Sequence, residues 1–361
     1  MTSNTEPGAV WILGATGRVG RAVAARIKAQ GGTATLVGRD EERLRTVAAD
    51  LGLGDDAQVV VADTADRIAA EITRQRPAVV LNTIGEYAAT ATRIARACLP
   101  GGHYLDLAND LVAVPRLLDL HEEAAAGGST LVTGAGFGVL ATEAVVARLC
   151  EGRPTPDHVR VDALASVAND GGTVGTSLAA SVIDALTTGG RRYRDGRLVT
   201  ARLGADPRHL TLPDGETAKT ASVPSAELLA AQRASGAPSV VVTSVLAPTA
   251  PAARAALPLA GRLLSIPALR RFAVRRLAAI RLKAAPRPRR HSWGHAVVSW
   301  PDGTTREGWL RAGEAMDYTA AVAAETAARL ARGEGKPGAH TPAAALGPDL
   351  AVAAGGTFIL D

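Results

Sequence analysis

Short apolar runs alternate with amphipathic stretches through the first 140 residues of the chain. Residues 10–14 are an apolar run, and residues 17–30 carry Val19, Val23 and Ile27 at helical spacing, which predicts a strand followed by a helix. The alternation continues, with strands predicted in 33–39, 57–63, 78–85, 103–108 and 130–136 and helices in 40–52, 64–76, 89–102 and 114–128. Six strands alternating with helices are typical of a doubly wound parallel sheet, so the fold class is α/β over this part.

From about residue 150 the pattern changes. Residues 158–166 alternate as a strand, residues 173–189 have a helical pattern, and a long helix is predicted over 314–332. Asp-Gly pairs begin at Asp195, Asp214 and Asp302, each between strand-like runs, and they predict three hairpins. This second part is therefore expected to be an inserted α+β domain with a mainly antiparallel sheet.

Three glycines, Gly14, Gly17 and Gly20, lie between the first predicted strand and helix. In a dinucleotide-binding turn the first glycine permits a sharp bend, the second lets backbone N–H groups approach a pyrophosphate, and the third lets helix and strand pack closely. Three glycines alone are a weak signal, and a tight turn without a ligand is the alternative. The full alternating set that follows favours a dinucleotide. The turn residues expected at the cofactor are Gly14, Thr16, Gly17, Arg18, Val19 and Gly20.

Gly38 and Arg39 end the second strand, where NAD enzymes usually place a carboxylate for the ribose 2′-hydroxyl. An arginine pairs instead with the 2′-phosphate of NADP, and Arg18 could supply a second cation. Asp40 follows one residue later, where it could serve as the missing acid or cap the next helix. We therefore predict NADP as the cofactor, with NADPH preferred over NADH.

Further candidate cofactor contacts lie at the ends of the third and fourth strands. Asp63 could accept a hydrogen bond from the adenine amino group, and Asn82, Thr83 and Gly85 are expected beside the nicotinamide half, because ligands of parallel sheets lie at the carboxyl ends of strands. Loop capping is the alternative role for Asp63 and for Asn82.

Four stretches of the chain carry a resemblance to a known family: LGATGRVGRAVAARI, LVGRDEERL, VVLNTIGEYAATATRIARACLPGGHYLDLA and GAGFGVLATEAVVARL. They resemble the saccharopine dehydrogenase-like oxidoreductases, a group that includes the trans-acting enoyl reductases of lipid and polyketide pathways. The likeness covers most of 10–150 and resumes in GGTVGTSLAASVIDAL and KPGAHTPAAALGPDLAVAAGG. It implies an NAD(P)-binding Rossmann domain and hydride transfer to or from a C=N or activated C=C bond.

The resemblance also sets the expected domains, and a length of 361 residues suggests two. We expect the Rossmann domain over 1–148 and an α+β domain for substrate and dimer contacts over 149–312. A C-terminal helix and tail over 313–361 would return to the Rossmann domain. A homodimer is expected from the same resemblance.

Candidates for proton transfer follow the fourth and fifth strands. Members of the family commonly carry proline after the glycine that ends strand four, whereas here Gly85 is followed by Glu86. Glu86 could orient a cationic substrate or act as an acid, or it could point to solvent. Tyr87 could donate a proton or form an aromatic wall for the nicotinamide. Asp106, the third catalytic candidate, could instead hold loop amides.

Other patterns are set aside or left open. Thr173 and Thr176 could face the substrate or cap a helix, and the chain has no Tyr-x-x-x-Lys pair. His291 and His295 have helical metal spacing, but the residues around them alternate as a strand and no third ligand follows, so no metal is expected. The tryptophans at 293, 300 and 309 suit sheet packing, so nucleic-acid binding is not expected despite a pI of about 9.6.

The positive charge is concentrated in one segment. No acidic residue lies between Glu227 and Asp302, yet twelve Arg and Lys occur from Arg233 to Arg290, whereas the other residues hold 28 basic and 35 acidic groups. The segment from Arg254 to Arg290 could contact an acidic carrier protein, a membrane surface or a partner subunit. Within it, Ile266, Leu269, Ala273, Leu277 and Ile280 form a helical stripe. A helix over 266–283 could lie on a membrane surface or pack on the second domain.

The leading hypothesis is an NADPH-dependent reductase of a small or carrier-bound metabolite, with secondary metabolism as one setting. The alternative is a non-catalytic NAD(P)-binding sensor or scaffold protein. The sequence shows no secretion signal and no membrane span, and its two cysteines form no CxxC pair, so a cytoplasmic location is expected.

Overall fold

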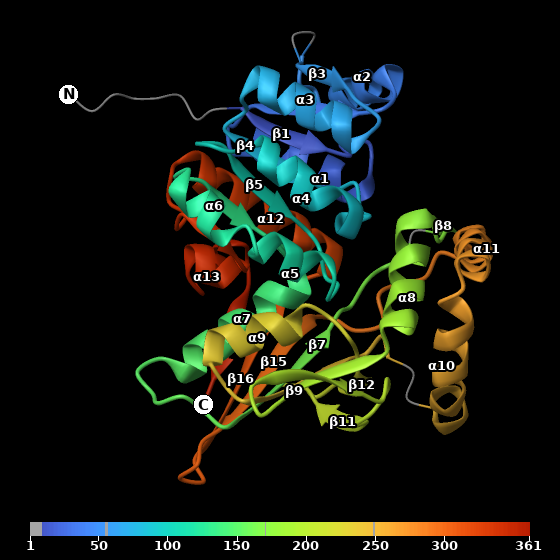
Figure 1. Ribbon diagram of the computed structural model, residues 1–361, viewed down its shortest axis with the longest axis vertical. Coiled ribbons are helices and arrows are strands. Elements are labelled where there is room, and N and C mark those ends of the chain that lie inside the picture. Colours follow the sequence, from blue (N-terminus) through green and yellow to red (C-terminus); the bar gives the residue numbers. More distant parts are fainter. Residues whose placement is uncertain (1–8, 55–56, 170, 248–249) are drawn as a thin grey trace. The chain divides into compact units, whose positions relative to one another are not determined.

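The computed structural model describes residues 9–54, 57–169, 171–247 and 250–361 and divides the chain into two compact units (Figure 1). The first unit comprises Met1–Ala108, Val112–Leu140 and Met316–Ala354. The second comprises Asn109–Leu111, Ala141–Ala315 and Gly355–Asp361. None of the helices in the described ranges is both long and apolar enough to cross a membrane.

The first unit contains a parallel sheet of seven strands in the order β17-β6-β5-β4-β1-β2-β3. Its strands are β1 (Val10–Leu13), β2 (Ala34–Gly38), β3 (Val59–Val61), β4 (Val79–Asn82), β5 (His103–Asp106), β6 (Thr130–Val132) and β17 (Gly338–His340). The order reverses at β1, as in a doubly wound sheet, which confirms the predicted fold class. The seventh strand, β17, was not predicted; it comes from the C-terminal segment and pairs with β6.

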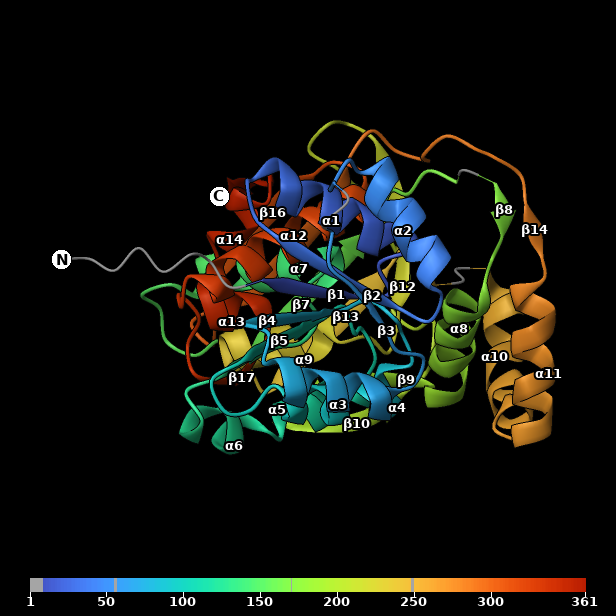
Figure 2. The ribbon, with the colours of Figure 1, turned by 90° about the horizontal axis from the view of Figure 1, so that it is seen from above.

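Helices cover both faces of this sheet. They are α1 (Arg18–Ala29), α2 (Glu41–Asp50), α3 (Ala65–Gln75), α4 (Tyr87–Ala97), α5 (Ala113–Leu118), α6 (His121–Ala126), α12 (Ala315–Ala331), α13 (Pro342–Leu346) and α14 (Leu350–Ala353). Figure 2 shows α1 and α2 on one face and α3 and α4 on the other. The helix predicted over 114–128 is two short helices, α5 and α6.

The second unit contains a mixed sheet of nine strands. Its strands are β7 (His158–Leu164), β9 (Gly190–Arg194), β10 (Arg197–Ala201), β11 (Arg208–Thr211), β12 (Thr217–Ser222), β13 (Ser239–Ser244), β15 (Ser292–Ser299), β16 (Thr305–Ala312) and β18 (Thr357–Leu360). Strands β7 and β13 pair in parallel, and the other neighbours pair antiparallel, as predicted. The helices α7 (Phe137–Cys150) and α9 (Glu227–Ser235) also contribute to this unit.

All three predicted hairpins are present. The turns at Asp195, Asp214 and Asp302 join β9 to β10, β11 to β12 and β15 to β16. At the first turn Asp195 and Gly196 both have positive φ, 51° and 71°, the conformation that makes Asp-Gly a hairpin signal.

The C-terminal segment divides between the two units, which corrects the predicted return of all of 313–361 to the first domain. Strand β17 joins the parallel sheet, but β18 pairs antiparallel with β16, with Ile359 opposite Trp309. The backbone N–H and C=O groups of β18 form hydrogen bonds with the edge strand β16. The local sequence pattern does not show with which sheet edge a terminal strand will pair.

Candidate functional site

The glycine turn joins β1 to α1, and steric constraints explain two of its glycines without any ligand. Gly14 has φ +79°, and a Cβ there would lie 2.8 Å from Thr83 Oγ1. A Cβ on Gly20 would lie 2.4 Å from the carbonyl oxygen of Gly14, so this glycine lets α1 pack against the end of β1. These are the bending and packing roles expected of the first and third glycines.

The middle glycine is different. Gly17 is exposed at the N-cap of α1, where φ is −78°, and a Cβ there would meet one atom, the Gly14 carbonyl oxygen, at 3.2 Å. Since the fold constrains this position least, its lack of a side chain fits the close approach of a phosphate group to the start of α1. Arg18 is exposed beside it, and Thr16 and Val19 are half-buried.

Two charged residues follow β2: Arg39 is exposed, and Asp40 is engaged as the cap of the next helix. Arg39 is exposed directly after Gly38. The side chain of Asp40 accepts a hydrogen bond from the Arg43 backbone N–H at 3.1 Å and so caps α2. This is the capping role expected as the alternative for Asp40, and it leaves Arg39 as the residue able to meet a ribose substituent.

Asp63, the candidate for the adenine, lies two residues beyond β3. Its carboxylate is half-exposed and lies 3.4 Å from Arg67 Nη1, one helical turn away. An exposed pair of this kind is weak, so it leaves Asp63 available for a ligand at little cost.

The loop after β4 is tied to the glycine turn by Thr83. The hydroxyl and the backbone N–H of Thr83 both donate to the Leu13 carbonyl, at 2.7 and 3.0 Å. Asn82 is fully buried, and its side chain donates to the Tyr104 hydroxyl at 3.0 Å and accepts from the Ile84 N–H at 3.1 Å. Asn82 therefore holds the loop, while Thr83 and Gly85 are half-buried beside the turn.

Glu86 and Tyr87 begin α4. Glu86 is exposed, with φ +47°, and makes no capping hydrogen bond through its side chain. Proline, whose φ is fixed near −65°, could not adopt this conformation, so the departure from the family's usual proline changes the backbone where it enters α4. Tyr87 is half-buried, and its hydroxyl lies 3.4 Å from the Asn82 carbonyl oxygen.

Asp106 is enclosed by donors at the end of β5. It is fully buried and accepts hydrogen bonds from the Tyr104 and Thr133 hydroxyls and from the N–H groups of Ala108 and Gly134, at 2.9–3.2 Å. Burial raises the pKa of Asp106 to about 6, although these hydrogen bonds oppose the shift. The arrangement fits the alternative role of holding loop amides.

Tyr104 was not singled out from the sequence, yet it links Asn82 to Asp106 across the ends of β4 and β5. The signal was present, because residues two apart in a strand share a face and Tyr104 precedes Asp106 by two. Burial, and then the nearby Asp106 charge, raise the pKa of the Tyr104 hydroxyl well above its ordinary value.

The register of the sheet brings most of the candidates of the first unit to one edge. Leu13 pairs with Val37 of β2 and with Asn82 of β4, and Asn82 pairs with Asp106 of β5. The glycine turn, Arg39, Thr83 and the Asp106 loop therefore all follow the carboxyl ends of neighbouring strands, which is where ligands bind in such sheets.

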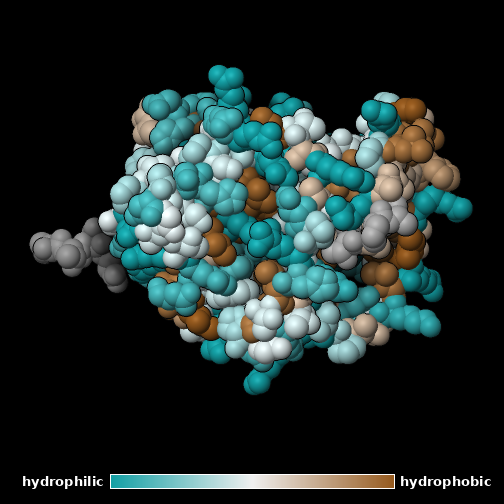
Figure 3. Space-filling model, turned by 90° about the horizontal axis from the view of Figure 1, so that it is seen from below, coloured by the Kyte–Doolittle hydropathy of each residue, from teal (hydrophilic) through white to brown (hydrophobic). Residues whose placement is uncertain are grey.

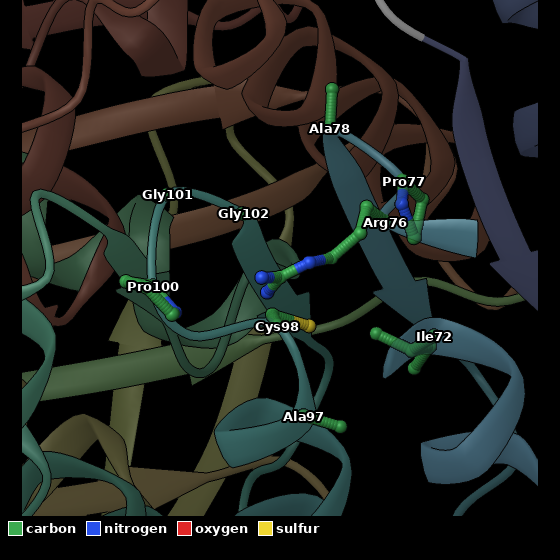
Figure 4. Close-up of a pocket in the computed structure, with 9 residues that line it drawn as sticks. All are labelled: Ile72, Arg76, Pro77, Ala78, Ala97, Cys98, Pro100, Gly101 and Gly102. Atoms are coloured by element: carbon green, nitrogen blue, oxygen red, sulfur yellow. The ribbon is translucent and has the colours of Figure 1, made fainter. Parts of the chain in front are cut away.

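A cavity of about 240 Å³ lies elsewhere in the first unit. It is lined by Ile72, Arg76, Pro77, Ala78, Ala97, Cys98, Pro100, Gly101 and Gly102 (Figure 4). Residues 77–78 and 101–102 immediately precede β4 and β5, so the cavity is at the amino ends of the strands. It is therefore at the opposite edge from the candidate site.

Thr173 and Thr176 do not act as helix caps. Thr173 lies in a short strand, β8 (Gly172–Thr173), paired with β14 (Arg281–Leu282), and the helix α8 (Thr176–Thr188) begins after Gly175. Gly171, Gly172 and Gly175 all have positive φ, which lies outside the right-handed helical region, so the helix starts only after Gly175. The capping role expected for Thr173 is therefore wrong.

A buried ionic network crosses the sheet of the second unit, and it was missed from the sequence. Asp162 on β7 is fully buried and pairs with Arg160 at 2.7 Å and with His295 Nδ1 at 2.9 Å. Burial alone would raise the pKa of Asp162, but hydrogen bonds from His295 and the Arg160 charge lower it to about 2. His295 Nε2 lies 3.0 Å from Glu307 Oε1.

Both ring nitrogens of His295 therefore contact carboxylates, those of Asp162 and Glu307. These contacts give His295 a structural role in the sheet. Its ring stacks on Trp309 with 3.8 Å between centroids. Among the described residues no group of three or more His, Cys, Asp and Glu side chains is placed to hold a metal ion. Trp293, Trp300 and Trp309 are buried, as predicted for sheet packing.

A doubly wound parallel sheet with a glycine turn after its first strand is the architecture typical of dinucleotide-binding domains. Residues 10–132 match the family described as the saccharopine dehydrogenase NADP binding domain. This match confirms the predicted resemblance and the predicted NADP cofactor at the level of this domain.

Two curated mycobacterial proteins share the same region. A trans-acting enoyl reductase of Mycobacterium leprae is 36% identical over 131 residues, which are 35% of this chain and 31% of that protein. A Mycobacterium tuberculosis protein provisionally described as a trans-acting enoyl reductase is 29% identical over 142 residues, 38% of this chain and 34% of that protein. The chain thus matches about a third of the length of these relatives.

A solved structure resembles the chain as a whole. Apo saccharopine dehydrogenase (L-Glu forming) from Saccharomyces cerevisiae covers 98% of this chain and 100% of its own, with a TM-score of 0.63 and 12% sequence identity. At this identity the likeness concerns the fold, and it confirms a Rossmann domain combined with a second α+β domain.

Proposed function

We propose that the protein is an NADPH-dependent reductase that acts on an activated C=C bond, or on a C=N bond, of a small or carrier-bound metabolite. One observation carries the proposal: Gly17 and Arg39 are both exposed at the same edge of the parallel sheet. Gly17 lies at the start of α1, and Arg39 directly follows the neighbouring strand β2. Relatives described as trans-acting enoyl reductases support C=C reduction and a carrier-bound substrate.

Different residues at this edge would bind different parts of the cofactor. The first amides of α1 and the exposed Arg18 would take the pyrophosphate, and Arg39 would take the 2′-phosphate, because phosphate oxygens accept charge-assisted hydrogen bonds from guanidinium groups. Thr83 and Gly85 would border the nicotinamide half. The cofactor, when bound, supplies the hydride, so the protein has to position the substrate and deliver one proton.

Tyr87 is the proposed proton donor. Its hydroxyl lies at the same edge, within 3.4 Å of the Asn82 carbonyl, and its ring is half-buried, so the oxygen is held in place. Asp106 has all its oxygens engaged by neighbouring donors and holds the loop instead. Glu86 is exposed, where it would orient a cationic group on a substrate.

The experiment is a substrate screen in which NADPH consumption is followed with α,β-unsaturated acyl thioesters, as small pantetheine esters and on a carrier protein, and with imines. Turnover of either class, lost in Tyr87→Phe while NADPH binding persists, supports the proposal. Tyr193→Phe, at a half-buried tyrosine of the second unit, is the matched control and should stay active. Turnover in Tyr87→Phe at the wild-type rate would exclude Tyr87 as the donor.

One other candidate is a sensor or scaffold that binds NADPH without consuming it. It is favoured because two of the three catalytic candidates are poorly placed for proton transfer: Asp106 is engaged by four donors, and Glu86 is exposed. Tight NADPH binding with no turnover across both substrate classes would support this second function against the first.

A further inference from the structure

Three helices of the second unit form a group of their own. These are α8, α10 (Pro251–Leu264) and α11 (Pro267–Ala278), which lie side by side in Figure 2. Ala179, Ile183 and Val274 are buried among them, and Ala273 and Leu277 pack partly against this centre. The inner side of the group is thus closed by its own side chains, including the middle of the predicted stripe.

The other side of α10 and α11 is apolar and open. On α10, Leu259 and Leu263 are 63% and 48% exposed and are four residues apart, and Ile266 follows at 49%. On α11, Leu269 and Phe272 are 42% and 60% exposed and are three residues apart. Residues at these spacings share one side of a helix, so each helix presents an apolar stripe outward. We call these five side chains the outer face.

Exposed basic side chains accompany the outer face on the same two helices. Arg262, Arg271, Arg275 and Arg276 are exposed on the same two helices, and the guanidinium of Arg276 lies 5.7 Å from the centre of the Phe272 ring. Neither helix contains an acidic residue. Figure 3 shows apolar and hydrophilic side chains interspersed on the right-hand side of the molecule, the side on which these helices lie in Figure 2.

We propose that the outer face of α10 and α11 binds the surface of an anionic phospholipid bilayer. Leu, Ile and Phe side chains that enter the headgroup region, flanked by arginines that meet lipid phosphates, are the combination by which interfacial helices bind membranes. Each component is present here on a closed helical group, so binding requires no unfolding. The proposal is independent of the reductase function.

The positive charge of the arginines argues against a second copy of the chain binding to the outer face. A two-fold interface places the same patch opposite itself, so the arginines of one copy would face those of the other. An acidic carrier protein would satisfy the arginines, but it would not by itself explain five large apolar side chains left in water. Exposed apolar patches of this kind mark contact surfaces.

The test is cosedimentation of the full chain with vesicles. We expect it to bind vesicles of phosphatidylglycerol and phosphatidylcholine in equal parts and to remain in the supernatant with phosphatidylcholine alone. Raising the salt concentration should weaken binding, because charges at the surface are screened beyond about 8 Å at physiological ionic strength.

Two double variants separate the contributions. Arg271→Glu/Arg275→Glu should lower the vesicle partition coefficient at least about tenfold. Leu269→Ser/Phe272→Ser should lower it about tenfold, because two apolar side chains no longer enter the interface. The matched controls are Arg194→Glu/Arg197→Glu, at exposed arginines of the β9–β10 hairpin, and Leu198→Ser, whose side chain is 41% exposed against 42% for Leu269. Both controls should bind like the wild type, and thermal unfolding shows whether each variant is folded.

Four results would overturn the proposal. The first is a wild-type chain that stays in the supernatant with the anionic vesicles. The second is unchanged vesicle binding by either outer-face variant. The third is a homodimer, measured by sedimentation without lipid, that becomes monomeric in Leu269→Ser/Phe272→Ser, since the face would then join two copies. Binding of an acidic acyl carrier protein through Arg271 and Arg275 without vesicle binding also counts against it.

Discussion

Replacing Gly17 by alanine should weaken NADPH binding far more than it weakens the fold. Gly17 is exposed at the N-cap of α1, its φ of −78° suits any residue, and a new Cβ would meet the Gly14 carbonyl oxygen at 3.2 Å. Alanine is a poorer N-cap than glycine, and the Gly14 carbonyl must shift slightly to admit the new Cβ, so the free energy of unfolding should fall by about 1 kcal/mol.

The effect on binding should be larger. A methyl group at the start of α1 holds the pyrophosphate away from the backbone amides there, and each hydrogen bond to a charged group contributes about 1.5–3 kcal/mol. Loss of one such bond raises the dissociation constant for NADPH by about ten- to a hundredfold.

Gly20→Ala provides the contrast, and Gly313→Ala the control. The Cβ of Gly20→Ala would lie 2.4 Å from the Gly14 carbonyl oxygen and 2.9 Å from Ala15 Cα, so α1 must move and about 1–3 kcal/mol of stability is lost along with binding. At Gly313 a Cβ has no neighbour within 4 Å, so neither property should change.

The assay pairs urea denaturation with calorimetric titration of NADPH for each variant. If Gly17→Ala binds NADPH with wild-type affinity, the start of α1 does not hold the pyrophosphate, and the glycines serve the turn alone.

Three further predictions concern charge. Arg39→Glu should lower NADPH affinity at least about tenfold while NADH binding persists, whereas Asp40→Ala should cost about 1 kcal/mol of stability and leave cofactor preference unchanged, as measured by titration and urea denaturation. Because burial raises the pKa of Asp106 from 3.8 to about 6, its ionisation is disfavoured in the folded state. The stability of the wild type relative to Asp106→Asn should therefore fall by about 2 kcal/mol as pH rises from 4 to 6, and a pH-independent difference would contradict this. Arg160→Met should destabilise the protein by about 3–5 kcal/mol, because the buried Asp162 loses its guanidinium partner and keeps only His295 as a partner for its charge. Arg160→Met/Asp162→Leu should recover part of the loss in urea denaturation.

Features set by neighbouring residues could be predicted from the sequence. The glycine turn, the three Asp-Gly hairpins and the Asp40 cap each depend on backbone conformations or hydrogen bonds within a few residues. The alternation of strands and helices indicated the parallel sheet for the same reason.

Features set by distant pairing could not be predicted. Asp162 and His295 are 133 residues apart and meet because β7 pairs with β15. The pairing of β18 with β16 could not be predicted either, because the local pattern of β18 would suit any sheet edge. Thr173 was placed at a helix start because its neighbours suit a helix, but three glycines with positive φ delay the helix to Thr176.

Calorimetric titration of the purified protein with NADPH and with NADH tests the central claim most directly. We predict that NADPH binds and that NADH binds at least about tenfold more weakly, because Arg39 meets a 2′-phosphate that NADH lacks. Binding of neither nucleotide at millimolar concentration would contradict the assignment of the glycine turn, and tighter binding of NADH would contradict the role of Arg39.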